Sequence, residues 1–204
     1  MSRTRAFLLS LLLLGFLDGC ASVPPPHVAA SPLTLPSEER AQVLYSLKEW
    51  QASGSASIQT ARGSESFSYR WREGPAHQEL SIYDPLGRTV ARLTADSDGA
   101  ELQTIDGKRE KAQSLEALLA KVLHVQLPAR ELPLWMLGLT SGASAVQRNA
   151  EGLPETLHSG DWDIHYLRYG AVGGLQMPSL LQADGPEGVR LRLAVTRWQL
   201  GAGS

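Results

Sequence analysis

Alternation of apolar and polar residues dominates the chain from about residue 66 onward. Phe67, Tyr69 and Trp71 alternate with serine and arginine residues, which predicts a strand with one buried face. The clearest case is Val189–Val195, where valine and leucine alternate with arginine and alanine. Turn residues (Gly, Pro and Asp) recur between such segments about every ten residues, a spacing that favours an antiparallel meander. We therefore expect an antiparallel sheet of at least about eight strands.

Three segments instead repeat apolar residues at the helical period. The first begins at Ser37, which is placed to cap it, and ends before Gly54. The second begins at Ser114 and is ended by Pro128, and the third carries Pro133 in its first turn and ends at Gly138. The apolar stripes are Val43, Leu44, Leu47 and Trp50 in the first, Leu115, Leu118, Leu119, Val122 and Leu123 in the second, and Leu132, Trp135 and Met136 in the third.

A sheet of this size tends to curl toward a barrel, and a barrel of about eight strands can hold one small ligand. Helices with one strongly apolar face would cover an open end of such a barrel. The pattern therefore predicts a mainly β fold that acts as a container for a lipid or another hydrophobic molecule.

The N-terminus has the pattern of a secretory signal. Arg3 and Arg5 precede the apolar stretch Ala6–Leu17, which is shorter than the roughly 20 residues that span a membrane. The sequence Leu17-Asp18-Gly19-Cys20 then resembles the lipobox of bacterial lipoproteins, although Asp18 departs from the usual small uncharged residue. That resemblance implies that Cys20 is acylated on its sulfur and its amino group. The alternative is a plain signal peptide with an incidental cysteine.

Three parts of the chain follow from these patterns. Residues 1–19 are the expected signal peptide, residues 20–36 an acylated cysteine with a proline-rich tether, and residues 37–204 a single binding domain. The tether contains five prolines and no charged side chain, a composition that favours extended chain.

Composition narrows the function further. Removal of residues 1–19 takes away two of 19 basic and one of 21 acidic side chains, leaving 17 against 20 and a net charge of −3. Nucleic-acid binding would need a clustered basic surface, so we expect none. Cys20 is the only cysteine, so the fold depends on its core without a disulfide.

Motifs for catalysis are missing from the sequence. It contains no phosphate-binding glycine loop, no Gly-x-Ser-x-Gly and no His-Glu-x-x-His. His158 and His165 lack metal-ligand spacing, and Asp161 and Asp163 fit a solvated strand face better than an acid–base pair. We expect no enzymatic activity, no catalytic residue, no metal and no cofactor.

Taken together, these pieces resemble the LolB family of outer-membrane lipoprotein receptors. The resemblance is carried by Cys20, by the small-residue strand Ser53-Gly54-Ser55-Ala56 and by the aromatic strand ending at Trp71. It continues through four later segments: Asp84-Pro85-Leu86-Gly87, Leu127-Pro128 with Leu134-Trp135-Met136-Leu137-Gly138-Leu139, Met177-Pro178, and a last strand ending at Trp198. It implies an incomplete antiparallel β-barrel enclosing an apolar cavity, with about three α-helices.

The same resemblance implies the partners. Family members take acylated lipoproteins from the periplasmic carrier LolA and insert them into the outer membrane, so LolA, acylated cargo and outer-membrane phospholipid are expected partners of a monomer. Ala21 follows the cysteine and does not give the signal, an aspartate there, that retains lipoproteins in the inner membrane. We expect a lipid anchor on the periplasmic face of the outer membrane. The alternatives are a structural outer-membrane lipoprotein and a lipocalin-like carrier of a small hydrophobic ligand.

The resemblance also assigns site residues. Leu86 corresponds to the exposed leucine of the family's protruding membrane-insertion loop, with Pro85 and Gly87 shaping the turn; the alternative is a turn leucine that folds back on the core. The expected lining of the acyl cavity or core is Phe67, Tyr69, Trp71, Leu118, Leu119, Val122, Trp135, Met136, Trp162, Ile164, Leu191 and Leu193.

Overall fold

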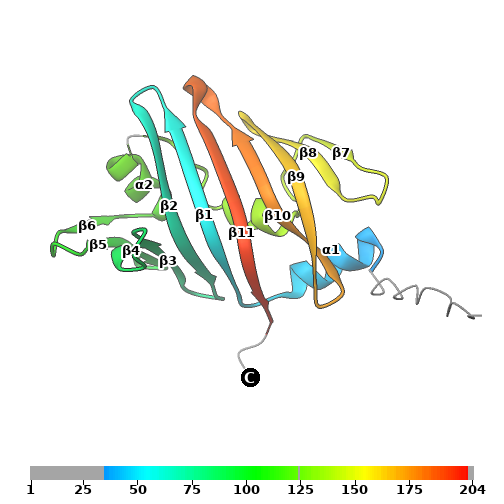
Figure 1. Ribbon diagram of the computed structural model, residues 1–204, viewed down its shortest axis with the longest axis horizontal. Coiled ribbons are helices and arrows are strands. Elements are labelled where there is room, and N and C mark those ends of the chain that lie inside the picture. Colours follow the sequence, from blue (N-terminus) through cyan, green and yellow to red (C-terminus); the bar gives the residue numbers. More distant parts are fainter. Residues whose placement is uncertain (1–34, 124, 202–204) are drawn as a thin grey trace, which may run out of the picture. The chain divides into compact units, whose positions relative to one another are not determined.

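Eleven strands form one antiparallel sheet whose order is β6-β5-β4-β3-β2-β1-β11-β10-β9-β8-β7 (Figure 1). The computed structural model describes residues 35–123 and 125–201 of the chain. The strands are β1 (Trp50–Thr60), β2 (Gly63–Glu73), β3 (Gln78–Tyr83), β4 (Thr89–Asp96), β5 (Gly99–Thr104), β6 (Arg109–Ala112), β7 (Ala145–Arg148), β8 (Pro154–Ser159), β9 (Trp162–Val172), β10 (Leu175–Asp184) and β11 (Arg190–Leu200). This unclosed sheet confirms the predicted incomplete barrel. Cys20, the expected signal peptide and most of the expected tether lie outside the described residues.

The helices lie on one face of this sheet. They are α1 (Ser37–Ser46), α2 (Leu115–Leu123) and α3 (Leu132–Leu137), with a 3-10 turn η1 (Pro186–Gly188) before β11. Figure 1 shows α2 to the left of β2 and above β6, and α3 behind the long central strands. Helix α2 packs on β5 and β6, and α3 packs on β10. The predicted count of about three α-helices is therefore confirmed for the described residues.

Strand alternation places the core between the sheet and these helices. On β11, Leu191, Leu193 and Val195 point inward and are buried, whereas Arg190 and Arg192 are exposed on the outer face. Burial of one such aliphatic side chain contributes about 1.5–3 kcal/mol. The alternation read from the sequence is thus what gives the sheet its inner and outer faces.

Two predicted helix ends agree with the structure. The Ser114 hydroxyl accepts a hydrogen bond from the Ala117 amide at 3.2 Å, which caps α2. Gly138 ends α3 in the left-handed region, with φ of 68°, where a residue without a Cβ is favoured.

The first helix differs from its prediction. Ser37 is the first helical residue rather than the cap, and no side chain caps the amides of α1. The helix ends at Ser46, and Trp50 begins β1 instead of extending the helical stripe. Trp50 pairs with Leu200 and Glu73 in the sheet, and its ring lies 5.5 Å from that of Trp198. Ladder hydrogen bonds and this aromatic contact stabilise the strand conformation here.

An arginine of α1 is buried and joins three elements. Arg40 is only 2% exposed. Its Nε donates to the Gln176 carbonyl at 2.5 Å, and its two terminal nitrogens donate to the carbonyls of Leu137 at 2.6 Å and Gly138 at 3.3 Å. Desolvation by burial lowers the pKa of Arg40 from its ordinary value. The guanidinium thereby fastens α1 to β10 and to the C-terminal end of α3, where the helix dipole favours a cation.

Candidate functional site

The turn between β3 and β4 presents Leu86 to solvent. Leu86 is 80% exposed, the highest value among the large hydrophobic side chains of the described residues. Pro85 and Leu86 occupy the two central positions of a turn that is closed by a hydrogen bond from the Gly87 amide to the Asp84 carbonyl at 2.9 Å. Gly87 follows with φ of 80°. Leu86 does not fold back on the core.

Asp84 holds this turn in one conformation. Its carboxylate accepts hydrogen bonds from the amides of Leu86 at 2.9 Å and Arg88 at 3.0 Å, and from the Arg88 Nε at 2.8 Å. The hydrogen bond from the Arg88 amide is the main cause of a pKa for Asp84 below its ordinary value. The chain therefore keeps an exposed leucine on an ordered turn, which forgoes roughly 1.5–3 kcal/mol of burial.

The inner face of the sheet is the second part of the candidate site. The structure buries ten of the twelve expected lining residues between the strands and the helices: Tyr69, Trp71, Leu118, Leu119, Trp135, Met136, Trp162, Ile164, Leu191 and Leu193. Phe67 is half-buried and packs against this core. Val122 differs, because it is exposed on the last turn of α2, beyond the residues that face the sheet.

Helices fill this interior. Trp135 of α3 and Leu118 of α2 are essentially inaccessible, as are Met136, Ile164 and Leu181. Trp135 lies 5.8 Å from Trp162 of β9, and its carbonyl accepts a hydrogen bond from the Tyr166 hydroxyl at 3.1 Å. The apolar space that the sequence predicts as a cavity is thus occupied by the protein's own side chains. An acyl chain that bound here would take the place of helix side chains.

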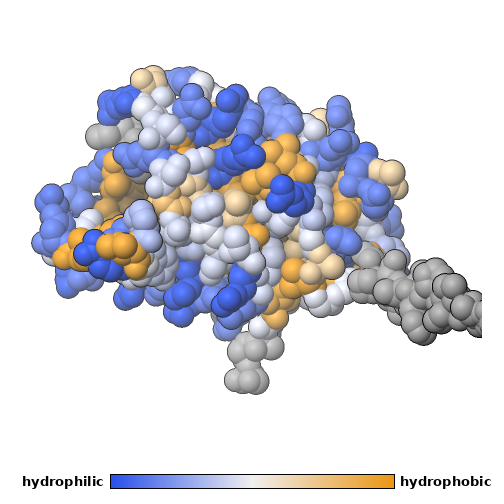
Figure 2. Space-filling model, viewed as in Figure 1, coloured by the Kyte–Doolittle hydropathy of each residue, from blue (hydrophilic) through white to orange (hydrophobic). Residues whose placement is uncertain are grey.

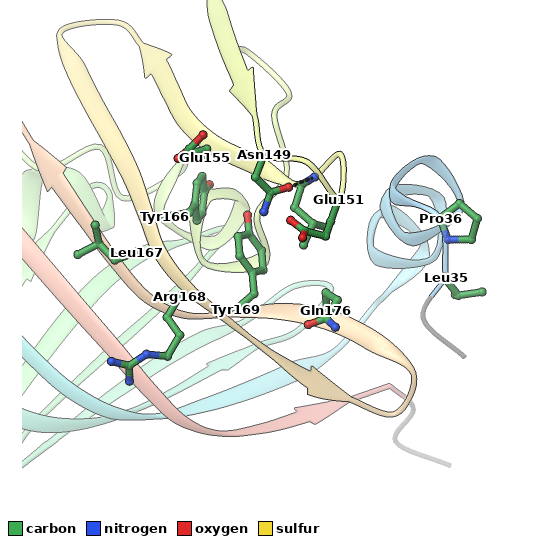
Figure 3. A pocket seen from close by; sticks show the side chains of 11 residues that line it. Leu35, Pro36, Asn149, Glu151, Glu155, Tyr166, Leu167, Arg168, Tyr169 and Gln176 are labelled. Carbon is green, nitrogen blue, oxygen red and sulfur yellow. Dashed lines mark hydrogen bonds between the residues drawn. The ribbon is translucent and has the colours of Figure 1, made fainter. Parts of the chain in front are cut away.

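A groove of about 680 Å³ with a mixed polar and apolar lining lies elsewhere, beside the start of α1 (Figure 3). Charged and amide side chains, among them Glu151, Glu155 and Arg168, line it together with Leu35 and Pro36. Tyr169 borders the groove, but its hydroxyl donates to the Pro154 carbonyl at 2.7 Å. Acyl chains buried here would lie against charged side chains that lose water, so this groove suits hydrocarbon less well than the inner face of the sheet does.

Sequence reasoning missed Arg40. An arginine between Glu39 and Ala41 at the start of an amphipathic helix looks like a solvated residue, and its carbonyl partners lie about a hundred or more positions away along the chain.

Among the described residues, none of the helices has both the length and the apolar character needed to span a membrane.

Sequence comparisons with known proteins point to one family. A sequence profile described as "Outer membrane lipoprotein LolB" matches residues 48–198. The outer-membrane lipoprotein LolB of Alkalilimnicola ehrlichii is 30% identical over 203 residues, which cover 98% of this chain and 99% of that protein. The corresponding protein of Vibrio campbellii is 28% identical and covers 96% of this chain, with 98% of its own length matched.

Solved structures match the fold at low sequence identity. A putative outer-membrane lipoprotein-sorting protein domain from Vibrio parahaemolyticus superposes with a TM-score of 0.55 at 10% identity, covering 82% of this chain and 91% of that one. A LolA superfamily protein from Nitrosomonas europaea gives a TM-score of 0.54 at 9% identity, with 82% and 92% covered. These two similarities concern the fold alone.

Proposed function

The chain belongs to the LolB family, and from this membership we propose that it takes acylated lipoproteins from LolA, holds their acyl chains against the inner face of its sheet and releases them where Leu86 meets the bilayer. It is an outer-membrane lipoprotein that takes part in lipoprotein localisation. Its role is that of a receptor, not of an enzyme. Neither of the other two functions considered, a structural lipoprotein or a carrier of small metabolites, explains the family match.

Leu86 is the observation that carries the proposal for release. A leucine that is 80% exposed on a turn fixed by Asp84 cannot be explained by packing. The folded protein does not bury this side chain, whereas the hydrocarbon of a bilayer can surround it with apolar groups. Pro85 restricts the backbone of the turn, and Gly87 permits the positive φ of 80° that follows it, so the turn presents Leu86 without steric strain.

The acyl chains would lie where α2 and α3 now pack. Arg40 fastens α3, whereas α2 packs on β5 and β6 at one edge of the sheet. Two surface ion pairs involve α2: Lys121 with Glu110, and Arg130 with Glu116 at 3.6 Å. Such exposed pairs contribute little to the free energy that keeps α2 packed on the sheet. We therefore assign the movement that admits cargo to α2, which exposes Leu115, Leu118 and Leu119 to the acyl chains.

Transfer needs no nucleotide in this scheme. Each buried methylene contributes about 0.8 kcal/mol, so chains pass from carrier to receptor to bilayer if each step improves their burial. Displacement of α2 costs free energy, and this cost offsets part of the free energy gained when the receptor buries the acyl chains. The receptor therefore binds acyl chains more weakly than the membrane does.

Transfer of a radiolabelled acylated lipoprotein from LolA to the purified protein, and then to outer-membrane vesicles, tests the proposal. The wild-type protein should pass both steps. Leu86→Glu should accept cargo normally and deliver it poorly, since a carboxylate in hydrocarbon is unfavourable by several kcal/mol. Leu86→Met is the matched control, because it keeps an apolar tip. Failure of the wild-type protein to accept cargo would refute the receptor role, and normal delivery by Leu86→Glu would refute the role of the loop.

A further inference from the structure

A second apolar side chain is exposed beside the Leu86 turn. Ile105, in the turn between β5 and β6, is 67% exposed, the second highest value among the large hydrophobic side chains of the described residues. A β-branched apolar residue gains nothing from this position within the protein, and its exposure forgoes burial just as that of Leu86 does.

The two turns are closed by the same kind of hydrogen bond and end in the same kind of glycine. The Gly107 amide donates to the Thr104 carbonyl at 3.0 Å, which places Ile105 and Asp106 at the central positions of the turn. Gly107 has a φ of 83°, close to that of Gly87. Asp106 accepts a hydrogen bond from the Thr104 hydroxyl and pairs with Lys108 at 3.1 Å, as Asp84 pairs with Arg88. Each turn thus carries one apolar tip beside a carboxylate that is paired with a cation, and Asp84 in addition accepts hydrogen bonds from two backbone amides of its own turn.

Both tips lie at the same end of the sheet. Strands β3, β4, β5 and β6 are consecutive neighbours, so the β3–β4 and β5–β6 turns lie on one side and the β4–β5 turn on the other (Figure 1). The Ile105 amide donates to the carbonyl of Val90, at the start of β4, at 2.9 Å. Figure 2 shows apolar surface interrupted by polar residues over this end of the molecule.

The charges around the tips are balanced. Arg88 pairs with Asp84, and Lys108 pairs with Asp106, so each turn carries one cation and one carboxylate. A surface of this kind fits the alternating phosphate and amine charges of zwitterionic headgroups and does not depend on an excess of anionic lipid.

We propose that Ile105 is a second membrane-contacting residue, and that Ile105 and Leu86 together form a two-point docking surface for a zwitterionic phospholipid bilayer. The proposal rests on the proposed role of Leu86 and deepens it. One inserted side chain leaves the protein free to rotate about the point of contact. Two contacts on neighbouring turns of one sheet fix the direction in which the inner face is presented to the bilayer.

Depth measurements test this directly. The mature, acylated protein has no free thiol, so single cysteines introduced as Leu86→Cys, Ile105→Cys or Ser97→Cys accept one environment-sensitive fluorophore each. Ser97 is exposed in the β4–β5 turn at the opposite end and is the matched control. In vesicles of phosphatidylethanolamine and phosphatidylcholine, the probes at 86 and 105 should shift to the blue and be quenched by lipids that carry a quencher in their acyl chains. The probe at 97 should show neither effect.

The outcomes separate this proposal from the one before it. Quenching at 86 with none at 105 overturns the second contact and leaves the role of Leu86 standing, whereas quenching at neither position overturns both. In the delivery assay, Ile105→Glu should lower delivery by about tenfold while Ile105→Leu keeps it. If Ile105→Glu instead blocks acceptance from LolA and leaves delivery unchanged, the tip docks a protein and the proposal is wrong.

Discussion

A single carboxylate, that of Asp84, organises the turn that carries Leu86. Its folded pKa lies below the ordinary value of 3.8, chiefly because the Arg88 amide donates to it. The order that it provides is therefore complete above pH 3.8 and is lost as the pH falls through the lower folded value. Asp84→Asn should remove this pH dependence and speed amide hydrogen exchange at Leu86 and Arg88. Nuclear magnetic resonance at several pH values measures both effects; unchanged exchange at neutral pH would contradict this role of the carboxylate.

Gly54 shows how one missing Cβ permits a close approach of two strands. The register of β1 and β11 shifts between Ser53 and Gly54, and a Cβ at residue 54 would lie 1.9 Å from the Ala194 carbonyl oxygen. Gly54→Ala should lower the free energy of unfolding by about 2 kcal/mol or more, because backbone must move. Ser55→Ala, on the exposed face next to it, should change the free energy by no more than about 0.5 kcal/mol. Urea denaturation of both variants measures the difference, and equal midpoints would refute the packing argument.

At the scale of elements, local pattern predicts most strands and turns but not every boundary. Val189–Val195 alternates so regularly that only a half-buried strand satisfies it, and Ser114 and Gly138 mark helix ends by local chemistry that needs no tertiary partner. Trp50 fits the period of α1 equally well, and only its distant partners Leu200 and Trp198 decide that it starts a strand.

Other features of the structure are not predicted by the sequence, either because the segment is short or because its contacts are distant. Strands β6 and β7 are short and mostly polar, so their sequences cannot be distinguished from those of loops. Ile105 looks like the continuation of β5, and nothing local shows that its side chain is exposed. Burial of Arg40 depends on carbonyls that α3 and β10 provide.

Arg40 fastens α1 to α3, and its loss should loosen that contact. Arg40→Met keeps most of the volume but leaves three carbonyls without a charged donor, which should cost about 2–3 kcal/mol. Amide exchange in α3 should rise in parallel. Arg62→Met, in the exposed β1–β2 turn, is the matched control and should change neither quantity. Stability lost without faster exchange in α3 would place the role of Arg40 elsewhere.

For the whole molecule, the anchor decides where the domain works. We expect the mature protein to begin at Cys20 and to carry acyl chains on its sulfur and its amino group, because Leu17-Asp18-Gly19 precedes the only cysteine of the chain. Mass spectrometry of the protein extracted from outer membranes measures this, with Cys20→Ser as the control that should leave residues 1–19 attached. An unmodified thiol at Cys20 would refute the anchor.

The unclosed sheet also bears on how the protein avoids aggregation. A sheet that is not closed keeps two free edges, and such edges can recruit strands from other chains. Here β6 and β7 form those edges, and each is only four residues long, whereas β1, β2, β9 and β11 have eleven. Arg109 and Lys111 along β6, and Arg148 on β7, add charge that a foreign strand would have to accommodate. The protein can therefore keep its sheet unclosed without offering a long template on which misfolded chains would grow.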